Sequence, residues 1–168
     1  PFARLKHPVT PERIARFERN VGPRWWRREI GGWLLVGLDT SLFGSELADE
    51  TRQMAFLKDA LASRKDTRKL VFLHLPPYES DPNDPAFTTM SVPHPARLGL
   101  LDACPAGGVR AIASAHLHVH RVLSHRGMQL VWAPTTAFVN IAKRLKEGYG
   151  FPRAGYIEWT LDGDALSF

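Results

Sequence analysis

The chain has 168 residues, a length that suits one domain with a sizeable buried core. Its formal net charge is +5, but basic and acidic residues are interspersed, so charge alone does not indicate a nucleic-acid-binding protein. No apolar run approaches the ~18–20 residues of a membrane span, and no charged-then-apolar leader opens the chain, so we expect no membrane segment and a cytoplasmic location. The single cysteine, Cys104, excludes an intrachain disulfide and a cysteine-based metal cluster.

The first half of the sequence predicts alternating helices and strands. Thr10-Pro11-Glu12 is typical of a helix start, because threonine caps well and proline suits the first helical position; the helix is expected to continue through 13–20. The near-continuous apolar run 33–39 predicts a strand that is buried on both faces. A stripe of apolar residues predicts a helix over 49–63, and 70–74 predicts the next strand. This strand–helix–strand order implies a parallel crossover.

The second half ends in antiparallel strands. Residues 76–95 form a long segment rich in Pro, Asp, Ser and Thr, and loops of this length are usually functional or mobile. A short helix over 96–103 then leads to a strand over 109–114. Four further apolar runs predict two β-hairpins, with strands at 119–124 and 128–133 and at 156–161 and 165–168. The sequence therefore predicts an α/β fold in a single domain, residues 1–168.

Histidines follow two of the predicted parallel strands. His116, His118 and His120 alternate, and in an extended chain side chains two residues apart point to the same face. His74 ends another apolar run, just before a Leu-Pro-Pro turn. Ligands bind at the carboxyl edge of open α/β sheets, and neutral imidazole is a common metal ligand. These four residues therefore indicate a site at one edge of the sheet.

Residues 24–28, Arg-Trp-Trp-Arg-Arg, are the densest basic segment. Aromatic rings between arginines can bind nucleic acid by stacking and phosphate pairing. The alternative is a loop whose tryptophans cover the edge of the core while the arginines stay in water. We favour the alternative because no nucleic-acid-binding motif accompanies the segment; a nucleic-acid partner would show steeply salt-dependent binding.

Four short segments together give a fairly specific signal, because they occur in a defined order at plausible distances. They are residues 32–40 (GWLLVGLDT), 53–57 (QMAFL), 71–77 (VFLHLPP) and 115–118 (AHLH). In this order they resemble the internal LDS strand, the Q-x-x-W-L helix, the strand that ends in a metal-ligand histidine and the Gly-His-x-His motif of the calcineurin-like metallophosphoesterases, particularly their phosphodiesterase-like branch. The resemblance spans roughly residues 29–138. It implies a layered sandwich of two mixed β-sheets flanked by helices, with the final hairpins in the second sheet.

The resemblance also implies a dimetal centre that hydrolyses phosphomonoesters or phosphodiesters. In it His74 and His116 would bind one metal ion and His118 the other. Manganese, iron and zinc are all admissible, since imidazole suits several transition metals. Two such cations hold the attacking and leaving oxygens and lower the pKa of bound water. His94 and His120 are the remaining candidates, for contacts with a phosphate-ester substrate.

The sequence lacks the family's earlier Asp-x-His, Gly-Asp and Gly-Asn-His segments, and Ala115 replaces the usual glycine. We therefore expect this chain to be the carboxyl-terminal half of such a domain, with the amino-terminal portion absent. Neutral histidines alone leave the repulsion between two cations uncompensated, so these 168 residues are not expected to form the full dinuclear catalyst by themselves. Asp39 ends a strand, but the family has no ligand there, so an orienting or structural role is expected.

Two other functions remain open from the sequence. A mononuclear zinc hydrolase would use His74, His116 and His118, with water in the fourth position. A degenerate phosphoesterase-like domain would serve as a binding or scaffold module without catalysis.

Overall fold

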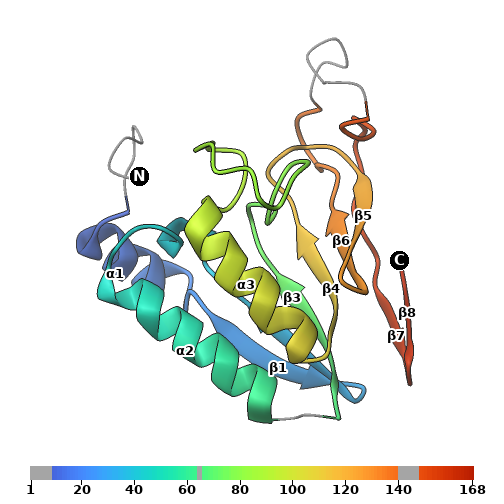
Figure 1. Ribbon diagram of the computed structural model, residues 1–168, viewed down its shortest axis with the longest axis horizontal. Helices are drawn as coiled ribbons and strands as arrows, with labels where there is room; N and C mark the ends of the chain where they lie inside the picture. Colours follow the sequence, from blue (N-terminus) through green and yellow to red (C-terminus); the bar gives the residue numbers. More distant parts are fainter. Residues whose placement is uncertain (1–8, 64–65, 140–147) are drawn as a thin grey trace.

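The computed structural model describes residues 9–63, 66–139 and 148–168. A six-stranded sheet carries helices on one face, and a short hairpin lies along its other side (Figure 1). The helices are α1 (Pro11–Asn20), α2 (Ala48–Ser63) and α3 (His94–Ala106), with a short 3-10 helix, η2 (Thr40–Leu42). The strands are β1 (Trp26–Ile30), β2 (Trp33–Gly37), β3 (Arg68–Phe72), β4 (Val109–Ser114), β5 (Arg121–His125), β6 (Met128–Trp132), β7 (Thr160–Asp162) and β8 (Ala165–Ser167).

The strand order of the main sheet is β1-β2-β3-β4-β6-β5. The four inner strands are parallel, and β1 and β5 pair antiparallel at the two edges. The crossover from β2 through α2 to β3 is therefore parallel, as the order of apolar runs predicts. The expected α/β class, a mixed sheet with flanking helices, is confirmed.

The two faces of the sheet have different partners. Leu34 and Val36 of β2 pack with α2 and α3 in the main core, which also takes buried side chains from β3, β4 and β6. Because side chains alternate along a strand, Trp33 points to the opposite face. There its Nε1 donates to Gly163 O at 3.0 Å, in the turn between β7 and β8. The C-terminal hairpin is thus attached to the face that the helices leave uncovered.

Strand β1 is a correction to the sequence analysis, which placed the basic segment 24–28 in a loop. Trp26–Ile30 instead forms a hairpin with β2, and the two-residue turn Gly31-Gly32 has φ of 55° and 80°. Such a turn needs positive φ at both positions, which glycine adopts without strain. The Gly-Gly pair was the signal for this strand.

The hairpin β5–β6 corrects a second expectation. It does not belong to a second sheet, because β6 pairs in parallel with β4 and so extends the main sheet. The two-stranded sheet contains only β7 and β8. Several boundaries also differ: β2 ends at Gly37, β3 spans 68–72 rather than 70–74, α3 is longer than 96–103, β5 spans 121–125 rather than 119–124, and β7 spans 160–162 rather than 156–161. None of the helices in the described ranges has the length and apolarity needed to cross a lipid bilayer.

Trp26 packs directly over a glycine on the neighbouring strand. Trp26 and Gly37 are cross-strand partners, and a Cβ on Gly37 would lie 2.3 Å from the indole ring. The ring also stacks on Phe72, with centroids 6.0 Å apart. An aromatic side chain therefore shields the bare backbone of Gly37 at the edge of the sheet.

We expect Gly37→Ala to lower the free energy of unfolding by about 1–3 kcal/mol, because the new methyl group overlaps a ring that also stacks on Phe72. Gly99→Ala is the matched control. Gly99 is exposed on α3 and its nearest Cβ contact would be 3.8 Å, so alanine there should raise the stability by about 0.5–1 kcal/mol. Urea unfolding of both variants measures the difference; equal midpoints would contradict the packing of Trp26.

Candidate functional site

Two histidines meet where β3 and β4 end. The hydrogen bonding between these strands continues beyond them, from Leu73 N to Ala113 O at 2.9 Å and from Ala115 N to His74 O at 3.0 Å. His74 is thereby aligned with the residue just before His116. Nε2 of His74 and Nδ1 of His116 lie 3.1 Å apart, and the rings meet edge to face.

The backbone around His116 and His118 is not extended. Their φ angles are 65° and 55°, in the left-handed region, and Leu117 N donates to Ala115 O at 2.7 Å. The expectation that alternating residues share one strand face is therefore wrong here, because the chain turns at each histidine. Non-glycine residues in this region cost about 1–3 kcal/mol each, and such strain concentrates at functional sites.

His118 lies near the pair but makes its hydrogen bond elsewhere. Its Nδ1 lies 2.6 Å from Phe138 O, so this nitrogen is the donor and Nε2 carries the lone pair. A charge on His118 lowers the pKa of His74 and of His116, so the three rings share one electrostatic neighbourhood.

Partial burial is the main reason that the pKa values of His74 and His116 are lowered. Each ring is also close to another imidazole, and a charge on His74 further lowers the pKa of His116. Nε2 of His116 is buried without a close hydrogen bond, and a weaker contact with the Thr89 backbone raises the pKa of the ring. Both imidazoles are therefore neutral at pH 7, the form in which histidine binds metals.

The spacing of the two nitrogens fits a shared cation. Two nitrogens that each bind one zinc ion at about 2.0–2.1 Å lie about 2.9–3.4 Å apart for ordinary ligand angles, and the observed value is 3.1 Å. Among the residues that the structure describes, however, no group of three or more His, Cys, Asp and Glu side chains is arranged to hold a metal ion. The spacing of the two nitrogens is also that of an ordinary N–H···N hydrogen bond between the rings.

The other two candidate histidines lie apart from this pair. His120 forms an isolated β-bridge with Phe151, and its Nδ1 is 3.5 Å from a guanidinium nitrogen of Arg153. His94 is the first residue of α3, and its ring forms no hydrogen bond or ring contact with His74 or His116. The predicted grouping of His120 with the other alternating histidines is therefore not observed.

Asp39 has the structural role that was expected of it. It caps η2, where Oδ1 accepts from Ser41 N at 2.9 Å and from Ser41 Oγ at 2.6 Å. Gln53 of α2 holds its backbone, accepting from Asp39 N at 2.7 Å and donating to Asp39 O at 3.1 Å. Both carboxylate and backbone are used to shape the end of β2.

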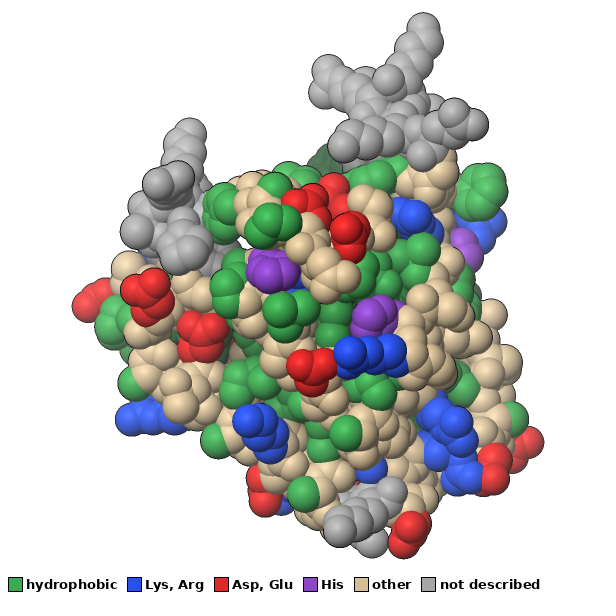
Figure 2. Space-filling view, in the orientation of Figure 1, with side chains coloured by type: hydrophobic (Ala, Val, Ile, Leu, Met, Phe, Trp, Pro, Cys, Tyr) green, Lys and Arg blue, Asp and Glu red, His purple; other side chains and the backbone are tan. Residues whose placement is uncertain are grey.

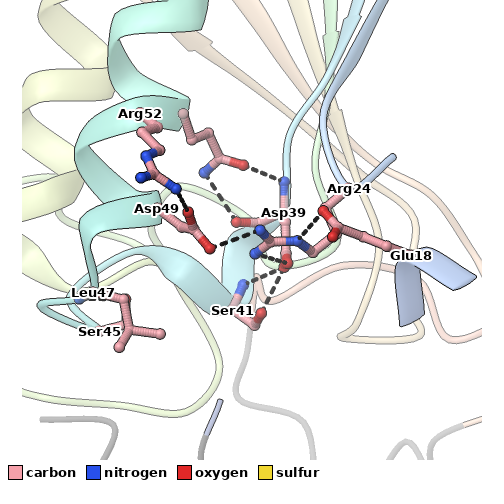
Figure 3. A network of polar contacts seen from close by, with 9 residues as sticks. Glu18, Arg24, Asp39, Ser41, Ser45, Leu47, Asp49 and Arg52 are labelled. Atoms are coloured by element: carbon pink, nitrogen blue, oxygen red, sulfur yellow. Dashed lines mark hydrogen bonds and ion pairs between the residues drawn. The ribbon is translucent and has the colours of Figure 1, made fainter. Parts of the chain in front are cut away.

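Arg24 corrects the expectation that the arginines of segment 24–28 stay in water. Its side chain is only 4% exposed and pairs with Glu18 at 3.1 Å and Asp49 at 2.9 Å, with Asp39 at 3.9 Å (Figure 3). The hydrogen bond from Arg24 lowers the pKa of Asp49. Because these acids come from α1, α2 and the end of β2, Arg24 joins three elements and is not available to nucleic acid.

The other basic residues form no continuous surface on the face of Figure 2, where acidic and basic side chains are interspersed among hydrophobic ones. Arg27, for example, is exposed on β1 but pairs with Asp59 of α2 at 2.8 Å.

The long loop after β3 is fastened to the sheet through Glu79. Its carboxylate accepts from Tyr149 Oη at 2.5 Å and from Thr88 Oγ1 at 3.1 Å, and its carbonyl accepts from Arg121 at 2.9 Å. Tyr149 and Arg121 both pack against the ring of Trp132. Burial and the hydrogen bond to Glu79 raise the pKa of Tyr149. Loop 76–93, which reaches His116 at Thr89, is thus held in one position.

The sequence analysis missed Arg24, Glu79 and Tyr149 as organising residues of this region. Arg24 meets Asp49 across 25 residues, and Glu79 meets Tyr149 across 70. No local pattern signals such pairs, since neither helix nor strand periodicity relates the partners.

Comparison with known proteins supports the fold. No protein-family model and no curated protein matches the sequence. Among solved structures, GAP50, described as the anchor in the inner membrane complex of Plasmodium, superposes with a TM-score of 0.56 at 14% identity, covering 74% of this chain and 42% of that one. A dimetal phosphatase from Danio rerio gives a TM-score of 0.47 at 13% identity, covering 66% of this chain and 48% of that one. The chain thus spans less than half the length of either protein. Its mixed sheet with flanking helices matches part of the fold of GAP50.

We expect the free energy of unfolding to fall as the pH drops below 6.5 in the presence of a chelator. The pKa values of His74 and His116 are lowered from 6.5 in the folded chain. The unfolded chain therefore takes up protons first as the pH falls, and this protonation stabilises the unfolded state relative to the folded one. Histidine NMR titration should place both pKa values below 6.5. In His74→Gln the pKa of His116 should move up, because a neighbouring charge is lost, whereas His125→Gln should leave both unchanged; an unmoved His116 contradicts the observed proximity.

Tyr149→Phe should lower the free energy of unfolding by about 1.5–3 kcal/mol, because a half-buried carboxylate loses its strongest donor. Tyr156→Phe is the control, since Tyr156 is 76% exposed and its hydroxyl should contribute within about 0.5 kcal/mol. Denaturant unfolding compares the two. If both variants behave alike, the Glu79 contact does not fasten the loop.

Proposed function

We propose that this chain provides the histidine side of a metal centre that hydrolyses phosphate esters in the complete protein. The observation that carries the proposal is the 3.1 Å separation of Nε2 of His74 and Nδ1 of His116 at the carboxyl edge of parallel strands. The ordered resemblance of four segments to the metallophosphoesterases and the match to part of that fold support it.

Each histidine has a defined part in this proposal. His74 and His116 present one nitrogen each to a common cation, and partial burial keeps both rings neutral by lowering their pKa values. His118 donates through Nδ1 to Phe138 O, which fixes its tautomer and leaves Nε2 as the second-ion ligand. A bound divalent transition metal, manganese, iron or zinc, would supply an activated water for attack on phosphorus.

The same residues explain why we propose a partial centre. Neutral imidazoles do not offset the charge of two close cations, and within the described ranges no third ligand side chain joins the pair. A carboxylate supplied from another part of the complete protein would provide this compensation. We therefore propose that residues 1–168 correspond to the carboxyl-terminal half of the catalytic domain.

A second candidate is a phosphoesterase-like binding or scaffold domain without catalysis. Two observations favour it: the described residues contain no three-ligand group, and the solved structure with a TM-score of 0.56 is described as an anchor. In this case the left-handed turns at His116 and His118 would be structural remnants of a former site.

Metal titration and turnover test the proposal. In isothermal titration with Zn²⁺ or Mn²⁺, the full-length protein should bind two ions and hydrolyse p-nitrophenyl phosphate or its diester. His74→Ala or His116→Ala should lower metal affinity and turnover at least about 100-fold, because removal of a direct ligand exceeds the effect of an outer partner. His125→Gln, a histidine outside the site, should change neither.

The outcomes separate the alternatives. One ion retained after dialysis, with turnover, indicates a mononuclear zinc hydrolase. No metal and no turnover in the full-length protein contradict the hydrolase and leave the scaffold. Two tightly bound ions and turnover by residues 1–168 alone would show that the centre needs no further part.

A further inference from the structure

A groove of about 500 Å³ lies next to the candidate metal ligands. One wall is α1, and the opposite wall is the segment that follows β2, where Asp39 and Ser41 lie. His74 also lines the groove, so this hollow reaches one member of the His74–His116 pair. A molecule held at the pair would have this space beside it.

The side walls of the groove are largely apolar. Ile14 and Phe17 of α1 and Leu38 after β2 line it, and the ring of Phe17 is 44% exposed. The carboxylate of Asp39, which also lines the groove, already has hydrogen-bond partners, since its Oδ1 accepts two hydrogen bonds from Ser41. Ligand pockets have this character: apolar walls with few polar groups.

One of those polar groups is a buried donor without an acceptor. Arg24 lines the groove and its side chain is 4% exposed, with Nε bonded to Glu18 and Nη2 to Asp49. Nη1 makes no hydrogen bond, and its carboxylate neighbour, Oδ2 of Asp39, is 3.9 Å away. Because Nη1 has no accessible surface and lies within ion-pair distance of Asp39, Arg24 shapes the wall of the groove and leaves contact with a ligand to the apolar side chains.

We propose that this groove binds the organic part of the substrate, and that this part is a planar aromatic ring. The inference rests on the proposed function, because it places the phosphate group of the ester at His74 and His116. The ring then packs against Phe17 in the groove beside His74. Phe17 becomes the residue that selects the ester.

The first test varies the ligand. Three phosphate monoesters serve as probes: 4-methylumbelliferyl phosphate and 2-naphthyl phosphate each have an aromatic ring, and glycerol 2-phosphate has none. Binding to the full-length protein is measured by calorimetry in EDTA, so that neither metal nor turnover is required. We expect the two aryl esters to bind about fivefold to tenfold more tightly than glycerol 2-phosphate.

Phe17→Ala should weaken both aryl esters about tenfold and leave glycerol 2-phosphate unchanged. Phe168→Ala is the matched control: it removes a phenylalanine of similar exposure, 42%, that packs on Trp159 away from the groove, and it should change nothing. Phe17→Leu keeps an apolar wall without the ring, and it gives the same readout if the alanine variant does not fold.

Equal affinity for the three probes, or aryl binding unaffected by both Phe17 variants, overturns the inference. If the protein binds two metal ions and hydrolyses all three esters at the same rate, the proposed role of the groove is contradicted and the proposed hydrolase function is not. If the aryl esters bind more tightly in EDTA but the protein binds no metal, the role of the groove is supported and the hydrolase function is contradicted.

Discussion

The parallel pairing of β3 with β4 is the constraint on which the site depends. Its register places Phe72 opposite Ala113, and two further backbone hydrogen bonds extend the pairing to His74 and Ala115. Backbone geometry therefore brings His74 alongside His116 before any side chain is considered. The chain then departs from the strand in left-handed turns, which a continuous strand could not make, and these turns aim one ring nitrogen at the other.

A second organising interaction is the burial of Arg24 among acids from three elements. A buried charge is tolerated only when it is paired and hydrogen-bonded, and here two of its nitrogens are satisfied by Glu18 and Asp49. The same guanidinium holds α1 against the end of β2, which forms the groove beside His74. The third nitrogen is buried within ion-pair distance of Asp39, so the packing of α1 and the shape of the groove depend on the same residue.

The long loop illustrates how a segment without regular structure is held in place. Glu79 gathers hydrogen bonds from Thr88 within the loop, from Tyr149 and from Arg121 on β5. From the helix side, buried Arg97 of α3 donates to the carbonyl of Asp84 at 2.6 Å. Loop 76–93 is held both from the sheet and from α3, so it would lose little further conformational entropy on contact with a ligand. The part of the loop near His116 is in this sense preformed.

The sequence by itself determined the α/β class, the parallel crossover through α2 and the presence of histidines at the ends of β3 and β4, because apolar periodicity and strand–helix order are local properties of the chain. The Gly31-Gly32 turn carried a further local signal, for the hairpin that includes β1. Only the tertiary structure decided which histidines meet: it joined His74 to His116 and turned His120 away toward Phe151. It also decided the partners of Arg24 and Glu79. These contacts join residues far apart in the chain, and their formation depends on the register of strands and the docking of helices, which no short-range pattern encodes.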